Sequence, residues 1–161
     1  LLRQLVDSRL MMIIRQATAD DYVSLIEIWE ASVRATHDFL PEANISALKP
    51  LILEHYFDAV ALRCACINGY PAGFIGVADN NIEMLFVHPE HFGLGIGKAL
   101  VHYAQRHLAA VKVDVNEQNP MAIGFYEKMG FTRTGRSALD GQGNPFPLIH
   151  MSTKVKPENT L

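Results

Sequence analysis

Several features that would indicate other classes of protein are missing from this chain of 161 residues. No apolar run approaches the ~20 residues that a membrane-spanning helix needs. The spacing of the two cysteines matches no zinc site, and the seven histidines form no ligand cluster. No basic run appears, and the formal net charge is −3. We therefore expect no metal ion, no membrane and no nucleic acid among the partners of this protein.

The scarcity of cysteine bears on compartment and covalent structure. Cys64 and Cys66 stand one residue apart. We expect their side chains to point to opposite faces of one strand, so that they form no disulfide within it. Two unpaired thiols fit a reducing cytoplasm, and the cytoplasm is the predicted location.

Length and composition favour one globular domain. Apolar residues make up 49% of the chain and charged residues 19%, and we find no repeat, linker or low-complexity tract. Residues 1–10 lack the apolar centre of a signal peptide, so they are expected to be an extension or part of a misassigned start. The domain is predicted to span residues 11–155, and residues 156–161 a flexible tail.

Periodicity and turn residues predict a mixed order of strands and helices. The expected helices cover 22–36, 45–57 with an interruption or kink at Pro50, 95–109, and a segment that begins after Asn119. The expected strands cover 11–17, 60–67, 72–78, 82–87, 111–115, 132–139 and 146–153. Turns are expected at Asn68-Gly69, at Asn80-Asn81 and over 140–143.

The most informative segment runs from Val87 to Leu100, where an apolar strand leads into three alternate glycines and then into an amphipathic helix. Gly93, Gly95 and Gly97 let the backbone approach a ligand, because no Cβ stands in the way. The following helix offers unpaired N–H groups and the positive end of its dipole. The segment therefore predicts a site for a diphosphate.

Two well-known glycine loops do not match this segment. A Walker A loop would require glycine at Phe92 and a hydroxyl residue at Ala99. A dinucleotide fingerprint would require a third glycine at Lys98 or Leu100. Asp114 follows the loop at a sequence spacing that suits a ribose-binding acid. A nicotinamide-dependent enzyme is therefore kept as an alternative function.

The loop instead resembles the acyl-CoA loop of the GNAT acetyltransferases, in which Arg or Gln, two residues, Gly, any residue and Gly or Ala follow one another. Gly95-Ile96-Gly97 match the end of that pattern, and Val87-His88-Pro89 resembles the segment that precedes it. Phe92 departs from the pattern, because it stands where the family has Arg or Gln. We expect weaker CoA affinity as a result.

A second segment, Asn119 to Phe131, resembles the second GNAT signature, in the correct order after the first. Its physical features are also clear from the residues. Asn119 before Pro120 is a good helix start, and Gly130 suits a left-handed helix end. Ala122, Phe125, Tyr126 and Met129 share one face at helical spacing. Tyr126 is predicted to give its proton to the departing thiolate, or else to be a core aromatic residue.

The resemblance implies an α/β (α+β) architecture, the GNAT acyl-CoA N-acyltransferase fold. This fold is a mixed, mostly antiparallel sheet of about seven strands, splayed between the fourth and fifth and flanked by about four helices. Segments such as Ala35 to Leu40 and Val115 to Asn119 are similar to the YjaB-type branch of bacterial members. That branch is associated with acetylation of protein lysine.

The resemblance also implies the ligand contacts. The pantetheine arm would lie between the strands at 82–87 and 111–115, and Asn119 could contact the ligand as well as cap its helix. The residues expected to bind acetyl-CoA are Leu85, Phe86, Val87, Phe92, Gly93, Leu94, Gly95, Ile96, Gly97, Lys98, Asn119 and Tyr126.

The acceptor side is less clearly marked. Glu83 is the candidate general base, and a period of two places it on the face of Leu85 and Val87; the alternative is a solvated surface acid. His37, Phe39 and Phe146 are expected to line the acceptor pocket, and the alternative is simple loop packing. His150 is expected to be structural, and His88 exposed without a role.

These features predict an N-acetyltransferase that moves the acetyl group of acetyl-CoA directly to a primary amine in a ternary complex. The amine belongs to a protein lysine, a peptide or a small molecule. A non-catalytic acyl-CoA binding or sensing module is the main alternative: Phe92 favours it, and Tyr126 argues against it. A homodimer is left open.

Overall fold

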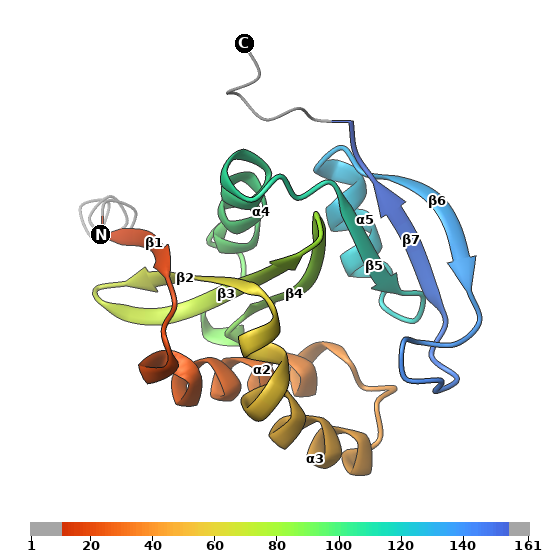
Figure 1. Ribbon diagram of the computed structural model, residues 1–161, viewed down its shortest axis with the longest axis horizontal. Helices are drawn as coiled ribbons and strands as arrows, with labels where there is room; N and C mark the ends of the chain where they lie inside the picture. Colours follow the sequence, from red (N-terminus) through yellow and green to blue (C-terminus); the bar gives the residue numbers. More distant parts are fainter. Residues whose placement is uncertain (1–10, 155–161) are drawn as a thin grey trace.

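The computed structural model describes residues 11–154, so the expectations for residues 1–10 and 156–161 lie outside the described part (Figure 1). Seven strands form one sheet in the order β1-β2-β3-β4-β5-β7-β6. The β4–β5 pair is parallel and every other neighbouring pair is antiparallel. The strands are β1 (Met12–Gln16), β2 (Ala61–Ile67), β3 (Tyr70–Ala78), β4 (Asn81–Val87), β5 (Lys112–Asn116), β6 (Thr132–Ser137) and β7 (Leu148–Ser152).

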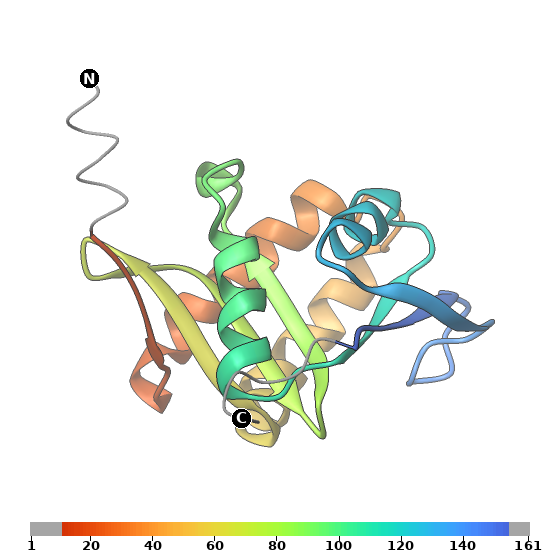
Figure 2. The same cartoon turned by 90° about the horizontal axis from the view of Figure 1, so that it is seen from above.

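Four α-helices flank the sheet: α2 (Tyr22–Thr36), α3 (Glu42–Leu51), α4 (Ile96–His107) and α5 (Pro120–Lys128). Helices α2 and α3 lie on one face, beside β1–β4, whereas α4 and α5 lie on the other (Figures 1 and 2). None of the helices within residues 11–154 is both long enough and apolar enough to cross a bilayer. The mixed seven-stranded sheet with four helices confirms the predicted fold class.

The parallel strands β4 and β5 pair over only two positions. Asn81 lies opposite Lys112 and Ile82 lies opposite Val113, and beyond these residues no pairing continues. The predicted splay between the fourth and fifth strands is therefore confirmed. The gap interrupts the ladder in the middle of the sheet, where strand edges are accessible to a ligand.

Two apolar clusters stabilise the two faces. One cluster joins α4 and α5 to β3, β4, β5 and β7, and it includes Leu100, Ile123 and Met151. The other joins α2 and the segment 45–57 to β2, β3 and β4, with Phe57 and Phe74 at its centre. The second cluster contains no residue of β5, β6 or β7. One face of the C-terminal strands therefore has no helix packed on it among residues 11–154.

A β-bulge corrects the expected orientation of Glu83. Gly76 pairs with Met84 and Val77 pairs with Ile82, so Glu83 is the extra residue of β4. The extra residue resets the alternation of side chains. Ile82 consequently packs in the same cluster as Leu85 and Val87. The prediction that Glu83 shares their face was wrong, because simple alternation does not allow for a bulge.

The second helical segment begins earlier than predicted. Helix α3 starts at Glu42, after Pro41 in an extended conformation with ψ 150°. The guanidinium of Arg34 on α2 binds the Glu42 carboxylate, with 2.6 Å between Nη1 and Oε2. Pro50 lies inside α3, which continues to Leu51, so the helix type changes just after the position where an interruption or kink was expected. The chain then forms a wider π-helical turn, Ile52–Tyr56.

The hairpin turns follow the residues that tolerate positive φ. Asn68 (φ 53°) and Gly69 (φ 86°) form the predicted turn between β2 and β3. Between β3 and β4 the turn residues are Asp79 (φ 50°) and Asn80 (φ 66°), one position before the predicted turn. Both central residues of this tight turn need positive φ, and Asp and Asn are among the residues that accept it.

The two cysteines lie on the same face of β2, so the expectation of opposite faces was wrong. Their Sγ atoms are 3.8 Å apart, and both thiols are free and buried. Side chains two positions apart in a strand share a face, since the period of the pleat is two residues. Burial raises the pKa of the Cys64 thiol to about 12, which keeps it protonated and unreactive.

Candidate active site

The glycine loop connects the end of β4 to α4 through a short 3-10 turn, Pro89–His91. Gly93 and Gly95 adopt φ values of 80° and 79°, which residues with a Cβ rarely adopt. A Cβ added at either glycine would meet no other atom within 4 Å. The backbone of the loop is therefore open to a ligand directly before the N-terminus of α4.

Buried apolar contacts hold the first turn of α4 in place. Ile96 is only 2% exposed and packs in the cluster around α4 and α5. A Cβ added at Gly97 would lie 3.6 Å from Cζ of Phe125, an ordinary van der Waals distance, so α4 packs beside α5 at this position. Phe92 and Leu94 are exposed by contrast, at 46% and 55%. The loop is thus a fixed backbone with apolar side chains facing solvent.

His88 has a local structural role at the start of this loop. Its Nδ1 atom accepts a hydrogen bond from the Glu90 backbone N–H at 3.1 Å and so caps the 3-10 turn. The side chain is half-buried rather than exposed. The prediction of an exposed histidine without a role was therefore wrong.

The second signature segment forms α5 as expected. Oδ1 of Asn119 accepts a hydrogen bond from the Ala122 N–H at 3.2 Å, and Gly130 ends the helix with φ 96°. Tyr126 is buried, with its ring 5.1 Å from that of Phe125 and 5.5 Å from that of Phe131. Burial raises the pKa of Tyr126, because the phenolate form would lose its hydration. The phenol therefore remains protonated at neutral pH, as a proton donor must.

Tyr126 and the parting strands belong to one apolar cluster. Val113 of β5 and Ile82 of β4 are buried in it, and Leu85 and Val87 pack against it. The structure therefore brings together the glycine loop, Tyr126 and the β4 residues predicted to bind acetyl-CoA.

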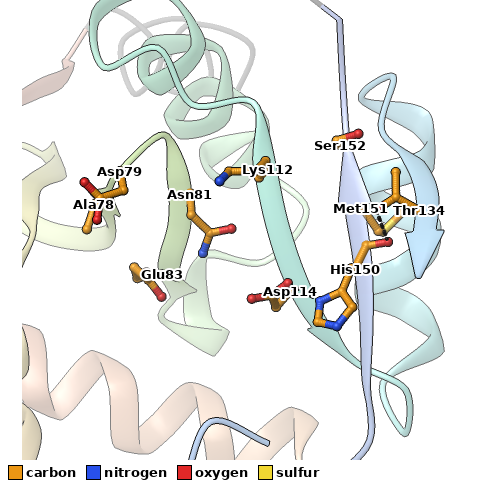
Figure 3. Close-up of a pocket in the computed structure, with 10 residues that line it drawn as sticks. All are labelled: Ala78, Asp79, Asn81, Glu83, Lys112, Asp114, Thr134, His150, Met151 and Ser152. Carbon is orange, nitrogen blue, oxygen red and sulfur yellow. Dashed lines mark hydrogen bonds and ion pairs between the residues drawn. The ribbon is translucent and has the colours of Figure 1, made fainter. Parts of the chain in front are cut away.

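A cavity of about 550 Å³ opens at the β4–β5 gap (Figure 3). Figure 3 shows Asn81 and Glu83 on β4 across from Lys112 and Asp114 on β5, with His150 on β7 beside Asp114. The lining residues are Ala78, Asp79, Asn81, Glu83, Lys112, Asp114, Thr134, His150, Met151 and Ser152.

Glu83 also borders a second, more apolar cavity of about 320 Å³. Its other lining residues are Tyr56, Ala59, Val60, Ala78 and Met84. The bulge thus places an exposed carboxylate between a polar and an apolar cavity.

The three residues predicted to line the acceptor pocket come together as a row of rings. The ring centroids of His37 and Phe39 are 5.3 Å apart, and those of Phe39 and Phe146 are 6.2 Å apart. Burial lowers the pKa of His37. The row connects the loop after α2 to the loop before β7, but none of its members lines either of the two cavities above.

Comparisons with known proteins agree with this geometry. The family model for an acetyltransferase (GNAT) domain matches residues 42–155. Peptidyl-lysine N-acetyltransferase YjaB of Salmonella typhimurium (strain LT2) is 39% identical over 142 residues, which cover 88% of this chain and 98% of that protein. The chain belongs to the GNAT family. It is an acetyl-CoA-dependent N-acetyltransferase, so the binding module and the nicotinamide-dependent enzyme are not favoured.

Solved structures of the family share the fold. The solution structure of apo-form YjaB from Escherichia coli superposes with a TM-score of 0.79 at 35% identity, covering 89% of this chain and 97% of that one. PaiA N-acetyltransferase from Thermoplasma acidophilum, in complex with coenzyme A, has a TM-score of 0.69 at 21% identity, covering 88% and 98%. Within residues 11–154, no group of three or more His, Cys, Asp or Glu residues could hold a metal ion.

One arrangement on this GNAT sheet was not anticipated. Nδ1 of His150 lies 2.6 Å from Oδ1 of Asp114, and its Nε2 lies 2.6 Å from Oγ of Ser137. His150 was expected to be structural, and Asp114 was considered only as a ribose-binding acid. The three residues come from β5, β6 and β7, and no local sequence pattern connects them.

Proposed function

We propose that this GNAT enzyme acetylates the ε-amino group of lysine in proteins or peptides, by direct transfer from acetyl-CoA in a ternary complex. The observation that carries the proposal is the parting of β4 and β5 after Ile82 and Val113. Tyr126 belongs to the apolar cluster on the α5 side of this gap, and Glu83 borders the cavity that opens there. The relatives from Salmonella typhimurium and Escherichia coli, both named peptidyl-lysine N-acetyltransferase YjaB, support lysine as the acceptor.

The glycine loop binds the acetyl donor, acetyl-CoA. Main-chain N–H groups from Phe92 to Lys98 hold the pyrophosphate, because Gly93 and Gly95 leave the backbone open and α4 begins there. Polar backbone atoms of Leu85, Phe86 and Val87 hold the pantetheine arm, since β4 has no partner strand beyond Ile82 on its β5 side. Phe92 adds no charge to this site, which weakens CoA binding relative to an arginine.

Tyr126 protonates the departing thiolate. When bound, acetyl-CoA supplies an activated acyl group and a thiolate leaving group. A buried phenol with a raised pKa is protonated before the reaction and lies in an environment where a proton donor is effective. Asn119 fixes the start of α5 and thereby the position of Tyr126 along the helix.

Glu83 acts as the base on the acceptor side. A lysine ammonium must lose a proton before it can attack, and Glu83 accepts this proton directly or through a water molecule. The bulge exposes the Glu83 carboxylate at the border of both cavities, where the amine arrives. The row of His37, Phe39 and Phe146 guides the approach of the peptide. The free Cys64 and Cys66 thiols suit a reducing compartment, so we place the enzyme in the cytoplasm.

An acceptor screen tests this function. Release of free CoA thiol is measured with acetyl-CoA and a panel of lysine peptides and small amines, and the products are located by mass spectrometry. We expect turnover with lysine peptides and a loss of about 10²-fold in kcat for Tyr126→Phe, the typical contribution of a positioned acid. Tyr103→Phe is the matched control, because Tyr103 lies on α4 with its ring against His107. CoA binding without turnover of any acceptor would contradict the proposal and favour the binding module.

A further inference from the structure

We propose that Asp114, His150 and Ser137 form a second reactive site, in which the Ser137 hydroxyl is the nucleophile toward small activated acyl esters. The site borders the same cavity as Glu83, but it uses none of the residues proposed for acetyl transfer. It lies on the face of β5, β7 and β6 to which the apolar cluster of α2 and α3 does not extend. The argument starts from two contacts of 2.6 Å, one on each nitrogen of the His150 ring.

The sheet itself sets the order of the three groups. Asp114 on β5 pairs directly with His150 on β7, and His150 pairs with Gly135 on β6. Ser137 lies two residues beyond Gly135 on the same strand, so its side chain points to the face of β6 on which the His150 ring lies. Three neighbouring strands therefore present an acid, an imidazole and a hydroxyl in sequence on a rigid surface.

The imidazole ring of His150 lies next to Gly135. A Cβ added at Gly135 would lie 3.5 Å from Cδ2 of His150, so the ring lies over this glycine and extends toward Ser137. The Thr134 hydroxyl, at a bulge of β6, donates to the backbone carbonyl of His150 at 3.2 Å. The strand that carries the imidazole is thus fastened to the strand that carries the hydroxyl.

A neutral imidazole carries one proton, and its tautomer decides which ring nitrogen donates. An ionised Asp114 carboxylate can only accept, so Nδ1 of His150 carries a proton and donates it. Nε2 is then unprotonated and accepts from the Ser137 hydroxyl. A nucleophile within hydrogen-bond reach of a base, with the base oriented by a third group, is the arrangement that activates serine in unrelated hydrolases.

The surroundings favour a small substrate. His150 and Asp114 border the 550 Å³ cavity, and their side chains are 35% and 43% exposed. Strand β6 is the last strand of the sheet, so the N–H groups on its outer edge have no partner strand among residues 11–154. In the proposed site, donors on this edge bind the developing oxyanion. The Arg136 guanidinium is held in an ion pair with Glu117 instead.

The reaction balances with water as the only co-reactant. Oγ of Ser137 bonds to the ester carbonyl carbon while its proton moves to Nε2 of His150. The carbon–oxygen bond to the alcohol then breaks, and the proton on Nε2 goes to the leaving oxygen. Water attacks the carbonyl carbon of the acyl-serine and gives a proton to Nε2. The bond from that carbon to Oγ of Ser137 then breaks, Nε2 returns the proton to Oγ, and the carboxylic acid leaves with Ser137 regenerated.

Two measurements on the whole protein test the site. A fluorophosphonate probe is incubated with the enzyme and the labelled residue is mapped by mass spectrometry, and hydrolysis of p-nitrophenyl acetate is followed by absorbance. We expect the label on Ser137, and its loss in His150→Gln and Asp114→Asn. Hydrolysis should fall by about 10²-fold in Ser137→Ala, the order of effect expected for an activated nucleophile and base.

Control variants distinguish loss of this site from loss of acetyl transfer and from loss of the folded structure. His102→Gln changes an exposed histidine on α4, and it should label and hydrolyse as the wild type does. Ser137→Ala should keep its acetyl transfer to a lysine peptide, which also shows that it is folded. A wild-type protein without label on Ser137, or equal hydrolysis by wild type and Ser137→Ala, overturns the proposal whether or not acetyl transfer is found.

Discussion

The two halves of the sheet differ in how they are covered. Strands β1–β4 lie between α2 and α3 on one face and α4 on the other. Within residues 11–154, β5, β7 and β6 have only α5, on one face (Figures 1 and 2). The covered half contains Phe74 with no exposed surface. The open half carries Asp114 and His150 on its uncovered face, where they border a cavity (Figure 3).

The covered half of the sheet provides stability, and the open half keeps reactive side chains accessible. A carboxylate or an imidazole can be kept accessible only where no helix packs, because burial of an unpaired charge is costly. The gap between β4 and β5 is the border of the two halves. The groups proposed for acetyl transfer lie at this border, and the proposed Ser137 site lies beyond it on the open face.

The largest expected effect is on stability in the covered half. Phe74→Ala should lower the free energy of unfolding by about 3–5 kcal/mol, because the ring packs against Phe57 and Phe86 at 5.6 and 5.7 Å. Thr134→Ala in the open half removes one exposed hydrogen bond and should cost about 1 kcal/mol or less. Urea unfolding measures both, and equal losses would break the distinction between the halves.

The next largest effect is on the rate of acetylation, with no expected change in stability. Glu83→Gln should lower kcat/KM for acetylation of a lysine peptide by about 10²-fold, because the amide cannot accept the ammonium proton. The side chain is exposed at the bulge, so the unfolding midpoint should stay near that of the wild type. A folded variant that retains full activity would remove Glu83 from the mechanism.

Two glycine substitutions, one in the glycine loop and one in α5, test the comparison near the ligand site. Gly95→Ala forces a side chain into φ 79°, which costs about 1–2 kcal/mol and should weaken CoA binding about tenfold. Gly124→Ala in α5 meets no atom within 4 Å and should raise stability by up to about 1 kcal/mol. Calorimetric titration with CoA and thermal unfolding distinguish the two, and unchanged CoA affinity in Gly95→Ala would exclude the loop as the binding site.

The smallest effect concerns ion pairs and pH. Arg15 hydrogen bonds lower the pKa of Asp21 from 3.8 to about 2, so the folded state gains stability above pH 4 and loses it as pH falls toward 2. Asp21→Asn should remove about 1 kcal/mol of this acid-sensitive stability, because Arg15 is partly exposed. Glu117→Gln in the open half should show a change of the same sign but smaller, because Arg136 also lowers the pKa of Glu117 but solvent screens this exposed pair. Urea unfolding between pH 2 and pH 6 tests both.

Local patterns in the sequence predicted the backbone of the glycine loop and the two ends of α5. Gly93 and Gly95 adopt positive φ, Asn119 caps α5, and Gly130 ends it with positive φ. Each depends on backbone conformation within a few residues, which the residue types determine. The family resemblance rested on the same segments, and the family comparison confirmed it.

The errors arose where pairing between distant strands decides the geometry. The bulge at Glu83 is visible only in the register of β3 against β4. The first residue of α3, Glu42, forms an ion pair with Arg34 of another helix, which no local pattern shows. The opposite orientation expected for Cys64 and Cys66 was a different kind of error, because the period of a strand already places them on one face.

The sequence by itself determined the backbone of the ligand loop, since glycine alone tolerates those left-handed positions and needs no distant partner to adopt them. It likewise determined the caps of α5. Only the tertiary structure decided that Asp114, Ser137 and His150 meet, because three strands from separate parts of the chain must align in register before their side chains touch. Side-chain chemistry that spans several strands is a property of that register, and no local spacing in the chain encodes it.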